Sequence, residues 1–435
     1  MLNFSPQRFQ FVAKRLSTDH LVIEKAVEVA DRITTGHPDR AVVFTLRHLA
    51  ALANVSYPLM RHWVGGWGAE PYREFFLAKK RSRNSIRDRS LGRTGRRMRR
   101  VVVPSLELMR LQRWIHARIL LNTSVHRAST AFCKNASVID AARPHCGCRW
   151  LIKLDIENFF ESIYEPEIYR VFTGLGYPKL LAFELTRLCT RLVPAAQFSD
   201  NLLIPRGSFT RTRGPAFYDR YQPLKNSRKD RSGGLGFLKE DSDFYPVGGR
   251  VWHSAVPARL RLGSLPQGAP TSPMLANLAV RPLDEQLDKF ARGRGLVYTR
   301  YADDMTFSTT DKDFTREDAA KVVEYAIRCI EKEGLRLHAA KTQVVPPGAR
   351  RLVLGLQVDG AKPRLTREYR NNLRQHAYML GTKSIPPSEH ASARGFRSVF
   401  SMRRHIEGKI EHARQVEQDF AAEITGKLKD VDWPV

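Results

Sequence analysis

Three aspartates stand at positions from which carboxylates could bind metal ions together. Asp303 and Asp304 are adjacent and separate two β-rich runs, so the sequence predicts that they lie at a hairpin tip, where neighbouring side chains diverge. Asp155 ends the short apolar run Leu151–Leu154, which predicts a second strand. An Asp-Asp pair by itself is more often an ordinary turn. The additional carboxylate of Asp155 therefore favours a metal site over an ordinary turn.

Three carboxylates on two adjacent strands provide the ligands of a two-metal phosphoryl-transfer site. Mg²⁺ is a hard cation that prefers oxygen ligands, and two ions about 3.5 to 4 Å apart can stabilise both the attacking and the leaving oxygens. One ion would activate the 3′-hydroxyl of a primer, and the other would hold a triphosphate and the departing pyrophosphate. Alignment and charge stabilisation would supply the rest of catalysis. The sequence thus predicts a site for two Mg²⁺ ions, with Mn²⁺ as the alternative metal.

The net charge of the chain indicates a polyanionic partner. Lys and Arg number 72 against 44 Asp and Glu, which gives a formal net charge of +28. Nucleic acid is the commonest reason for such an excess, because each phosphate that a protein neutralises releases condensed counterions. Membrane surfaces and docking on ribosomes are the competing explanations. We therefore expect a protein that binds nucleic acid.

The composition is that of a folded protein without membrane segments. Hydrophobic residues make up 42% and aromatic residues 9% of the 435 residues, enough for two or three packed domains. No apolar run reaches the ~18 residues that a membrane span needs, and the N-terminus lacks a secretory signal. The five cysteines are too few for a disulfide framework, and the cluster His145–Cys148 lacks the second ligand pair of a zinc site. We expect a cytoplasmic protein with no membrane partner.

Hydrophobic periodicity predicts an α+β pattern along the chain. Apolar residues have helical spacing from about 8 to 64. An Arg-rich run from Lys79 to Arg100 follows, which predicts a flexible basic loop between two strands. A helix is predicted from Ser272 to about Ala291, a second from about Arg316 to Glu333, and a strand around Leu352–Leu354.

Two further regions differ from this pattern. Between about 195 and 262, Gly and Pro become frequent, basic residues cluster and periodicity disappears, which predicts a long insertion or mobile loop. After about Thr366 the chain is helical and basic, and Pro386–Pro387 interrupts the helical pattern. The sequence contains no internal repeat.

Three ordered motifs resemble the palm motifs of bacterial reverse transcriptases. They are Asp-Ile-Glu-Asn-Phe-Phe at 155–160, Leu-Pro-Gln-Gly-Ala-Pro-Thr-Ser-Pro at 265–273, and Tyr-Thr-Arg-Tyr-Ala-Asp-Asp at 298–304. The similarity extends from about Tyr72 to about Gln418. It implies an α+β, right-hand polymerase fold: a helical N-terminal region at 1–70, fingers at 71–150, a palm with a small antiparallel sheet at 151–360, interrupted by the basic insertion at about 195–262, and a helical thumb at 361–435.

Further motifs give the resemblance a retron-like character. Tyr-Ala-Asp-Asp-Met-Thr-Phe-Ser at 301–308, Val353–Leu356, Thr366–Arg370 and Gly408–Ile410 are similar to segments of retron enzymes and of related phage-defence reverse transcriptases. Two features depart from that pattern. Where retron enzymes usually carry Asn-Ala-x-x-His, this chain has Ala-Ala-Arg-Pro-His at 141–145, and its insertion is longer than the resemblance predicts.

The resemblance assigns roles to residues around the predicted metal site. It implies metal ligands at Asp155, Ile156, Asp303 and Asp304, with Tyr301 and Ala302 beside them in the substrate site. Phe160 matches the steric gate, a ring that would clash with a ribose 2′-hydroxyl and so select deoxynucleotides; a core aromatic is the alternative. Gln267 and Gly268 would line the nucleotide and template pocket, where a residue without a side chain permits close approach.

Basic side chains are assigned to the triphosphate and the pyrophosphate. Lys80, with Arg99 or Arg100, fits the fingers cations that clamp the triphosphate; the alternative in so basic a stretch is a general phosphate contact. Lys341 matches the palm lysine that protonates pyrophosphate, with an ordinary surface lysine as the alternative. The basic thumb would track the minor groove of a template–primer duplex.

The expected reaction is Mg²⁺-dependent extension of a 3′-hydroxyl with dNTPs on an RNA template. The resemblance implies a dedicated structured non-coding RNA as template and partner, a cDNA product and a role against phage. An effector protein or a second copy of the chain is a further candidate partner. One alternative is a group II intron-like mobile-element reverse transcriptase, disfavoured because no maturase or endonuclease segment follows the thumb. The other is a catalytically silent RNA-binding scaffold, which would have no reason to keep Asp155, Asp303 and Asp304.

Overall fold

The computed structural model of the chain divides into two compact units. It describes residues 5–16, 18–66, 70–78, 98–134, 136–192, 262–381 and 385–433. The first unit combines Met1–Lys134, Ile156–Gln286 and Tyr325–His338, and the second combines Asn135–Asp155, Leu287–Glu324 and Ala339–Val435. The predicted insertion at about 195–262 lies outside the described residues, except for its last residue.

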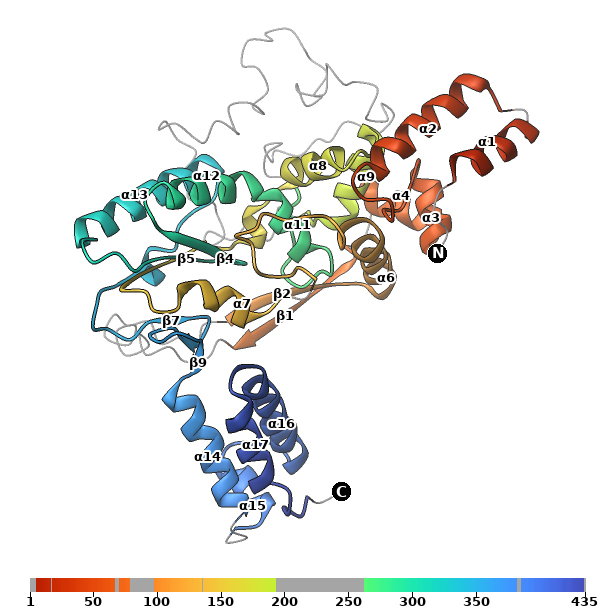
Figure 1. Cartoon of the computed structure of the whole chain (residues 1–435). Coiled ribbons are helices and arrows are strands. Elements are labelled where there is room, and N and C mark those ends of the chain that lie inside the picture. The colour runs from red at the N-terminus through yellow and green to blue at the C-terminus, as the bar shows by residue number, and fades with distance from the viewer. Residues whose placement is uncertain are drawn as a thin grey trace, which may run out of the picture. The chain divides into compact units, whose positions relative to one another are not determined.

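The first unit begins with four helices (Figure 1), which confirms the helical spacing found from about 8 to 64. They are α1 (Pro6–Arg15), α2 (His20–Thr34), α3 (Leu46–Ala53) and α4 (Tyr57–Gly65). Local signals determine where they start, because the side chain of Asp19 accepts from the N–H of Leu21 and that of Thr45 from the N–H of His48. Asn54 then ends α3 in the left-handed conformation.

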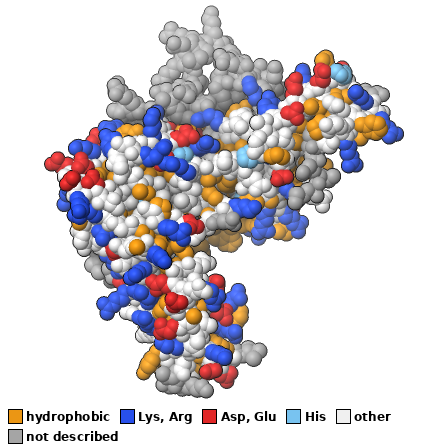
Figure 2. Space-filling view, viewed as in Figure 1, with side chains coloured by type: hydrophobic (Ala, Val, Ile, Leu, Met, Phe, Trp, Pro, Cys, Tyr) orange, Lys and Arg blue, Asp and Glu red, His pale blue; other side chains and the backbone are white. Residues whose placement is uncertain are grey.

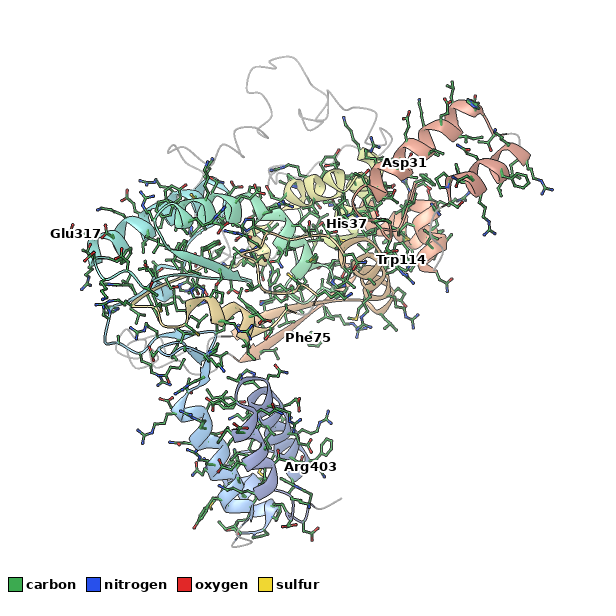
Figure 3. The ribbon with its side chains drawn as sticks, in the orientation of Figure 1. Asp31, His37, Phe75, Trp114, Glu317 and Arg403 are labelled. Atoms are coloured by element: carbon green, nitrogen blue, oxygen red, sulfur yellow. The ribbon has the colours of Figure 1, made fainter. Side chains whose placement is uncertain are left out.

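A two-stranded antiparallel ribbon follows in the same unit. Strand β1 (Tyr72–Ala78) pairs with β2 (Met98–Pro104), so the prediction of two strands on either side of the Arg-rich run is confirmed. Residues 79–97 of that run lie outside the described residues. Phe75, labelled in Figure 3, lies across from Val101 and is exposed.

The remaining helices of the first unit correct one prediction. After α6 (Leu106–Ile115), η1 (His116–Leu120), η3 (Phe160–Ser162), α8 (Glu165–Gly174) and α9 (Lys179–Cys189), the chain forms α11 (Ser272–Ala279). Helix α12 (Arg281–Arg292) follows and continues past Gln286 into the second unit. The prediction of a single helix from Ser272 to about Ala291 is wrong. The break falls at Val280, because Pro282 has no N–H to bond to the preceding turn and is tolerated only where a helix begins.

The second unit contains a four-stranded antiparallel sheet with the strand order β4-β5-β3-β6. Its strands are β3 (Trp150–Asp155), β4 (Val297–Tyr301), β5 (Asp304–Thr309) and β6 (Gln343–Val345). Helix α7 (Val138–Ala142) and the 3-10 turn η2 (Arg143–His145) precede β3. Helix α13 (Arg316–Lys332) and the 3-10 turn η9 (Ala339–Lys341) lie between β5 and β6. The expected small antiparallel sheet is therefore present.

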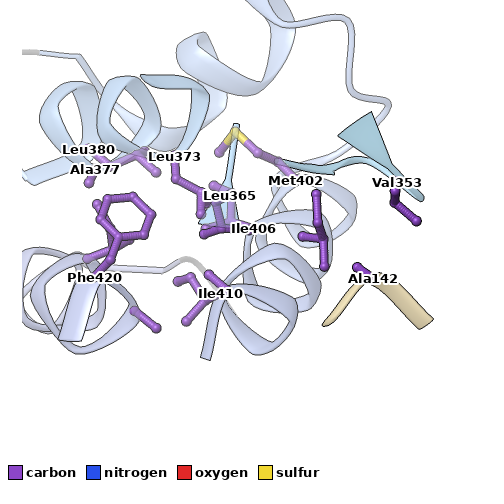
Figure 4. Close-up of a cluster of buried hydrophobic side chains, with 14 of the residues drawn as sticks. Ala142, Val353, Leu365, Leu373, Ala377, Leu380, Met402, Ile406, Ile410 and Phe420 are labelled. Carbon is purple, nitrogen blue, oxygen red and sulfur yellow. The ribbon is translucent and has the colours of Figure 1, made fainter. Parts of the chain in front are cut away.

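A helical bundle ends the second unit. Three short strands, β7 (Leu352–Val353), β8 (Leu356–Gln357) and β9 (Arg364–Leu365), form a separate sheet before it. The bundle consists of α14 (Arg367–Gly381), α15 (Pro387–Ala393), α16 (Val399–Val416) and α17 (Gln418–Lys427). Leu373, Ala377 and Leu380 recur at helical spacing on α14, and with side chains of α16 and α17 they form one buried hydrophobic cluster (Figure 4).

The surface carries the positive charge of the chain. Lys and Arg side chains lie over the N-terminal helices and over α14–α17 on the face shown in Figure 2, interspersed with fewer acidic ones. Among the described residues, no helix combines the length and the apolar character that crossing a bilayer requires.

The two ends of the segment that interrupts the first unit are joined by backbone pairing. The N–H of Arg191 donates to the carbonyl of Ser264 at 2.9 Å, and the N–H of Ser264 donates back to Arg191 at 3.0 Å. Gly263 is packed beside this pair, since a Cβ there would lie 2.6 Å from Oε1 of Glu165. The chain therefore leaves and re-enters the unit at one point.

We predict that residues 193–261 can be replaced by a short Gly-Ser linker that leaves Gly263 in place. The ends already meet, so a shorter connection lowers the entropy cost of closing the loop rather than adding strain. Thermal unfolding followed by circular dichroism should give a melting temperature no lower than that of the parent. A large drop would show that the fold depends on the replaced segment.

Two buried histidines lie against each other in the helical bundle. Nδ1 of His376 on α14 is 2.9 Å from Nε2 of His390 on α15. Burial, followed by the neighbouring His390, lowers the pKa of His376 to about 4, and Arg394, Lys409 and His405 act in the same direction. The pair is therefore neutral in the folded protein at neutral pH.

Mild acid should destabilise the bundle through this pair. The folded pKa of His376 lies below its ordinary value of 6.5, so the unfolded chain takes up a proton first as the pH falls from 6.5 towards 4. The loss at pH 5 is on the order of 2 kcal/mol. Unfolding of the parent and of His376→Leu at pH 7.5 and pH 5 measures it, with exposed His20→Leu as the control. The His376 variant should lose less on acidification than the parent; an equal loss would contradict the assignment.

Candidate active site

The hairpin formed by β4 and β5 carries the adjacent aspartates. Tyr301 ends β4 and pairs with Asp304, the first residue of β5, so Ala302 and Asp303 form the turn between them. This confirms the predicted hairpin tip. Ala302 has φ +56°, a left-handed conformation that a two-residue hairpin turn requires. The buried guanidinium of Arg300 donates from Nη1 to the carbonyl of Ala302 at 3.0 Å and so holds the turn.

The third aspartate lies on the neighbouring strand. Asp155, the last residue of β3, lies directly across from Asp304 of β5 in the antiparallel register. Residues that face each other in this way carry their side chains on the same side of the sheet. Tyr301, Asp304 and Asp155 therefore form one row, with Asp303 in the turn beside them. The structure thus brings the three predicted carboxylates together from strands that are far apart in the sequence.

Asp303 and Asp304 lie in an environment that disfavours their negative charge. Burial raises the pKa of Asp303, and the nearby carboxylates of Asp155 and Asp304 raise it further. Burial also raises the pKa of Asp304, where Lys153 acts against the rise and Asp155 adds to it. Bringing like charges together in a partly desolvated place requires a compensating cation.

Lys341 supplies one such cation. Its Nζ lies 2.7 Å from Oδ1 and 2.8 Å from Oδ2 of Asp155. The Lys341 side chain is 53% exposed, whereas that of Asp155 is only 7% exposed, so the ion pair joins a solvent-exposed ammonium to a buried carboxylate. The structure therefore places the predicted lysine at the predicted carboxylate.

The donor set fits magnesium better than a closed metal cage. All three side chains offer carboxylate oxygens, the ligands that Mg²⁺ prefers. Within the described part of the chain, no three acidic, His or Cys side chains converge closely enough to hold an ion by themselves. Mg²⁺ is commonly bound by one or two carboxylates together with waters and substrate phosphates. In donor chemistry, the carboxylate oxygens of the three aspartates match the predicted metal.

His145 has a role in the site that sequence analysis did not predict. It is fully buried, with Nδ1 at 2.7 Å from Oγ of Ser308 and Nε2 at 2.7 Å from Oγ1 of Thr299. Both hydroxyls lie on the face of the sheet that carries Asp304, so the imidazole ties β4 to β5 below the turn. Burial lowers its pKa to about 4, which keeps it neutral. The sequence feature that could have pointed to His145 was its place at the end of the segment at 141–145, where retron enzymes also carry a histidine.

The predicted nucleotide-pocket residues belong to the other unit. The N–H of Val102 on β2 donates to the carbonyl of Gln267 at 2.7 Å. The next residue, Gly268, has φ +127°, and a Cβ there would lie 2.8 Å from the carbonyl oxygen of Val102. Only glycine fits at this position, because both the backbone conformation and the close approach exclude a side chain. Phe160 lies in the same unit, half-buried in η3.

The remaining candidates also lie in the first unit or outside the described residues. Arg99 is exposed on β2, and Nη1 of Arg100 is 3.7 Å from Oε1 of Glu74. Ile156 is buried and forms a bridge with Leu337. Lys80 lies outside the described residues. Asp155, Asp303, Asp304 and Lys341 are thus the predicted residues that the structure brings together, with Tyr301 and Ala302 on the same hairpin.

Comparison with known proteins agrees with this geometry. The family model for reverse transcriptase (RNA-dependent DNA polymerase) matches residues 253–359, a range that contains the hairpin and Lys341. The chain is 28% identical over 295 residues to the retron Ec86 reverse transcriptase of Escherichia coli, covering 68% of this chain and 69% of that protein. It is 27% identical to the retron Mx65 reverse transcriptase of Myxococcus xanthus, covering 88% and 71%.

A further relative is the retron Mx162 reverse transcriptase of Myxococcus xanthus, which is 29% identical over 60% of this chain and 45% of its own length. The family match and these relatives agree with an acidic hairpin paired to a third carboxylate, an arrangement suited to nucleotidyl transfer. The chain thus contains a reverse transcriptase domain and is similar to bacterial retron reverse transcriptases, which supports RNA-directed DNA polymerase activity.

Proposed function

We propose that this reverse transcriptase copies a dedicated structured non-coding RNA into cDNA, and that Asp155, Asp303 and Asp304 are its catalytic carboxylates. The observation that carries the catalytic assignment is the register of the sheet, which sets Asp155 directly across from Asp304. The similarity to several retron reverse transcriptases supports the choice of template. By the same analogy the cDNA serves defence against phage in the cytoplasm, with an effector protein or a second copy of the chain as a further partner.

The carboxylates would hold two Mg²⁺ ions, joined by the backbone carbonyl of Ile156, which follows Asp155 in the chain. When bound, these ions would supply the charge stabilisation that attack by a 3′-hydroxyl and departure of pyrophosphate require. The hairpin fixes the direction of Asp303 and Asp304, since Arg300 and His145 hold it from the turn and from the strands. Orientation of this kind contributes to catalysis because the groups need no rearrangement during the reaction.

Lys341 has two consecutive tasks in this proposal. Its ammonium neutralises Asp155 in the free enzyme, as the paired contacts at 2.7 and 2.8 Å support. Release of the exposed lysine then frees the Asp155 carboxylate, and Nζ donates a proton to an oxygen of the departing pyrophosphate.

Residues of the first unit are assigned to nucleotide selection and binding by the resemblance. Phe160 selects deoxynucleotides, Gln267 and Gly268 line the pocket for nucleotide and template, and Lys80 with Arg99 or Arg100 clamps the triphosphate. The steric need for glycine at 268 supports close approach of the backbone there. Division of the chain into fingers at 71–150, palm at 151–360 and thumb at 361–435 remains a prediction.

We predict that Asp303→Asn lowers dNTP incorporation on poly(rA)/oligo(dT) with Mg²⁺ by about a hundredfold or more. The amide keeps the shape of the side chain but removes the charge that binds the metal. Asp313→Asn, on the exposed loop after β5, is the matched control and should retain activity. Equal activity of parent and Asp303→Asn would refute the assignment, and inactivity of both would favour the silent RNA-binding scaffold.

Loss of the lysine should slow chemistry rather than weaken nucleotide binding. We predict that Lys341→Met lowers kcat by about a hundredfold, the usual contribution of a general acid, with KM for dTTP little changed. The solvent deuterium effect on kcat should shrink, because the proton donor is gone. Lys341→Arg restores a cation beside Asp155 but is a poor acid, so it should recover little activity. Full activity of Lys341→Met would mean that this is an ordinary surface lysine.

A further inference from the structure

Phe132 has a backbone conformation that its side chain disfavours. Its φ is +62°, in the left-handed region, where a bulky residue is strained by contact between Cβ and its own carbonyl. Asn158, near the same aromatic cluster, also has a positive φ, but asparagine tolerates this region well. The conformation of Phe132 therefore needs a cause in the structure around it.

A buried hydrogen bond supports this conformation. Asn277 on α11 is fully buried, and its Nδ2 donates to the carbonyl of Ala131 at 2.7 Å. Ala131 is itself buried and immediately precedes Phe132. The loop is thereby attached to α11, the helix that begins within the Leu-Pro-Gln-Gly motif at 265–273. The backbone beside Phe132 is therefore held by a residue of α11, so the conformation of Phe132 depends on tertiary packing.

The result of this conformation is contact with the ring of Phe160. The centroids of the Phe132 and Phe160 rings are 6.3 Å apart with the planes tilted by 48°. Phe159 contacts the Phe160 ring as well, with centroids 5.4 Å apart and a tilt of 56°. Both arrangements are of the kind that aromatic pairs favour. Phe159 belongs to the core, Phe160 is half-buried and Phe132 is 37% exposed, so Phe132 is the outermost of the three rings.

We propose that Phe132 is a positioning residue that sets the discrimination between deoxyribonucleotides and ribonucleotides by restraining the Phe160 ring. This inference rests on the proposed function, in which Phe160 excludes the ribose 2′-hydroxyl. A ring can exclude a hydroxyl by contact only if it does not turn aside when the ribonucleotide enters. Phe159 restrains the Phe160 ring from the core, and Phe132 restrains it from the solvent side.

The test measures kcat/KM for dTTP and for UTP on poly(rA)/oligo(dT). Phe132→Ala should raise the relative use of UTP by about tenfold, the scale of discrimination that one apolar contact provides. Phe132→Leu, which keeps most of the apolar volume without a ring, should change the ratio in the same direction. Phe132→Tyr keeps the ring and should retain the selectivity of the parent. Phe11→Ala, an exposed phenylalanine on α1, is the control.

A double-variant cycle separates this role from a merely structural one. Phe160→Ala should relax selectivity by itself, and adding Phe132→Ala to it should have no further effect, because the ring to be restrained is gone.

If Phe160→Ala relaxes selectivity and neither Phe132→Ala nor Phe132→Leu does, the inference is wrong while the proposed function stands. The inference is equally wrong if the two Phe132 variants slow dTTP and UTP incorporation to the same extent. If Phe160→Ala itself leaves the ratio unchanged, the gate assignment fails and the inference fails with it. A parent without polymerase activity would instead refute the proposed function.

Discussion

Repulsion among three carboxylates at one end of the strands of a small sheet is the constraint on which the site depends. The pairing of β3 with β5 sets Asp155 and Asp304 across from each other, and the β4–β5 turn carries Asp303 beside them. Partial burial removes water that would otherwise screen the charges, which is why the pKa of Asp303 and of Asp304 is raised. The fold therefore places negative charges where cations stabilise them, at this end of the strands.

Lys341 supplies one cation beside Asp155. Lys341 contacts both oxygens of Asp155, and its side chain is about half exposed to solvent. The arrangement suits a catalyst in which the charge beside Asp155 must change between the free and the substrate-bound enzyme.

Rigid support for the carboxylates comes from buried polar groups on both faces of the hairpin. His145 joins Thr299 and Ser308 on the face that carries Asp304, and Arg300, one residue further along β4, bonds to the turn. Buried polar contacts of this type are costly unless satisfied, and when satisfied they restrict the chain to one arrangement. In the other unit, Gly268 and Phe132 have conformations that only specific surroundings permit, which is common where a site needs close control of geometry.

The sequence by itself determined the elements that carry the acidic residues, because strand and turn signals are local. The strand before Asp155 and the turn at Asp303 can be predicted from neighbouring residues alone, and so can the helical regions at about 8–64, about 316–333 and after about 366. The break between α11 and α12 was missed although Pro282 signals it, since apolar spacing continues through the break. The three ordered motifs carried the resemblance to bacterial reverse transcriptases.

Only the tertiary structure decided which distant side chains meet. Lys341 reaches Asp155 across 186 positions of the chain, His145 reaches Ser308 across 163, and Asn277 reaches Ala131 across 146. No periodicity or propensity reports such contacts, because they depend on strand register and on how helices pack after the elements have formed. Local signals thus determined the strands and the turn that carry the residues of the site. Their contacts, their burial and the strain at Phe132 are consequences of long-range packing.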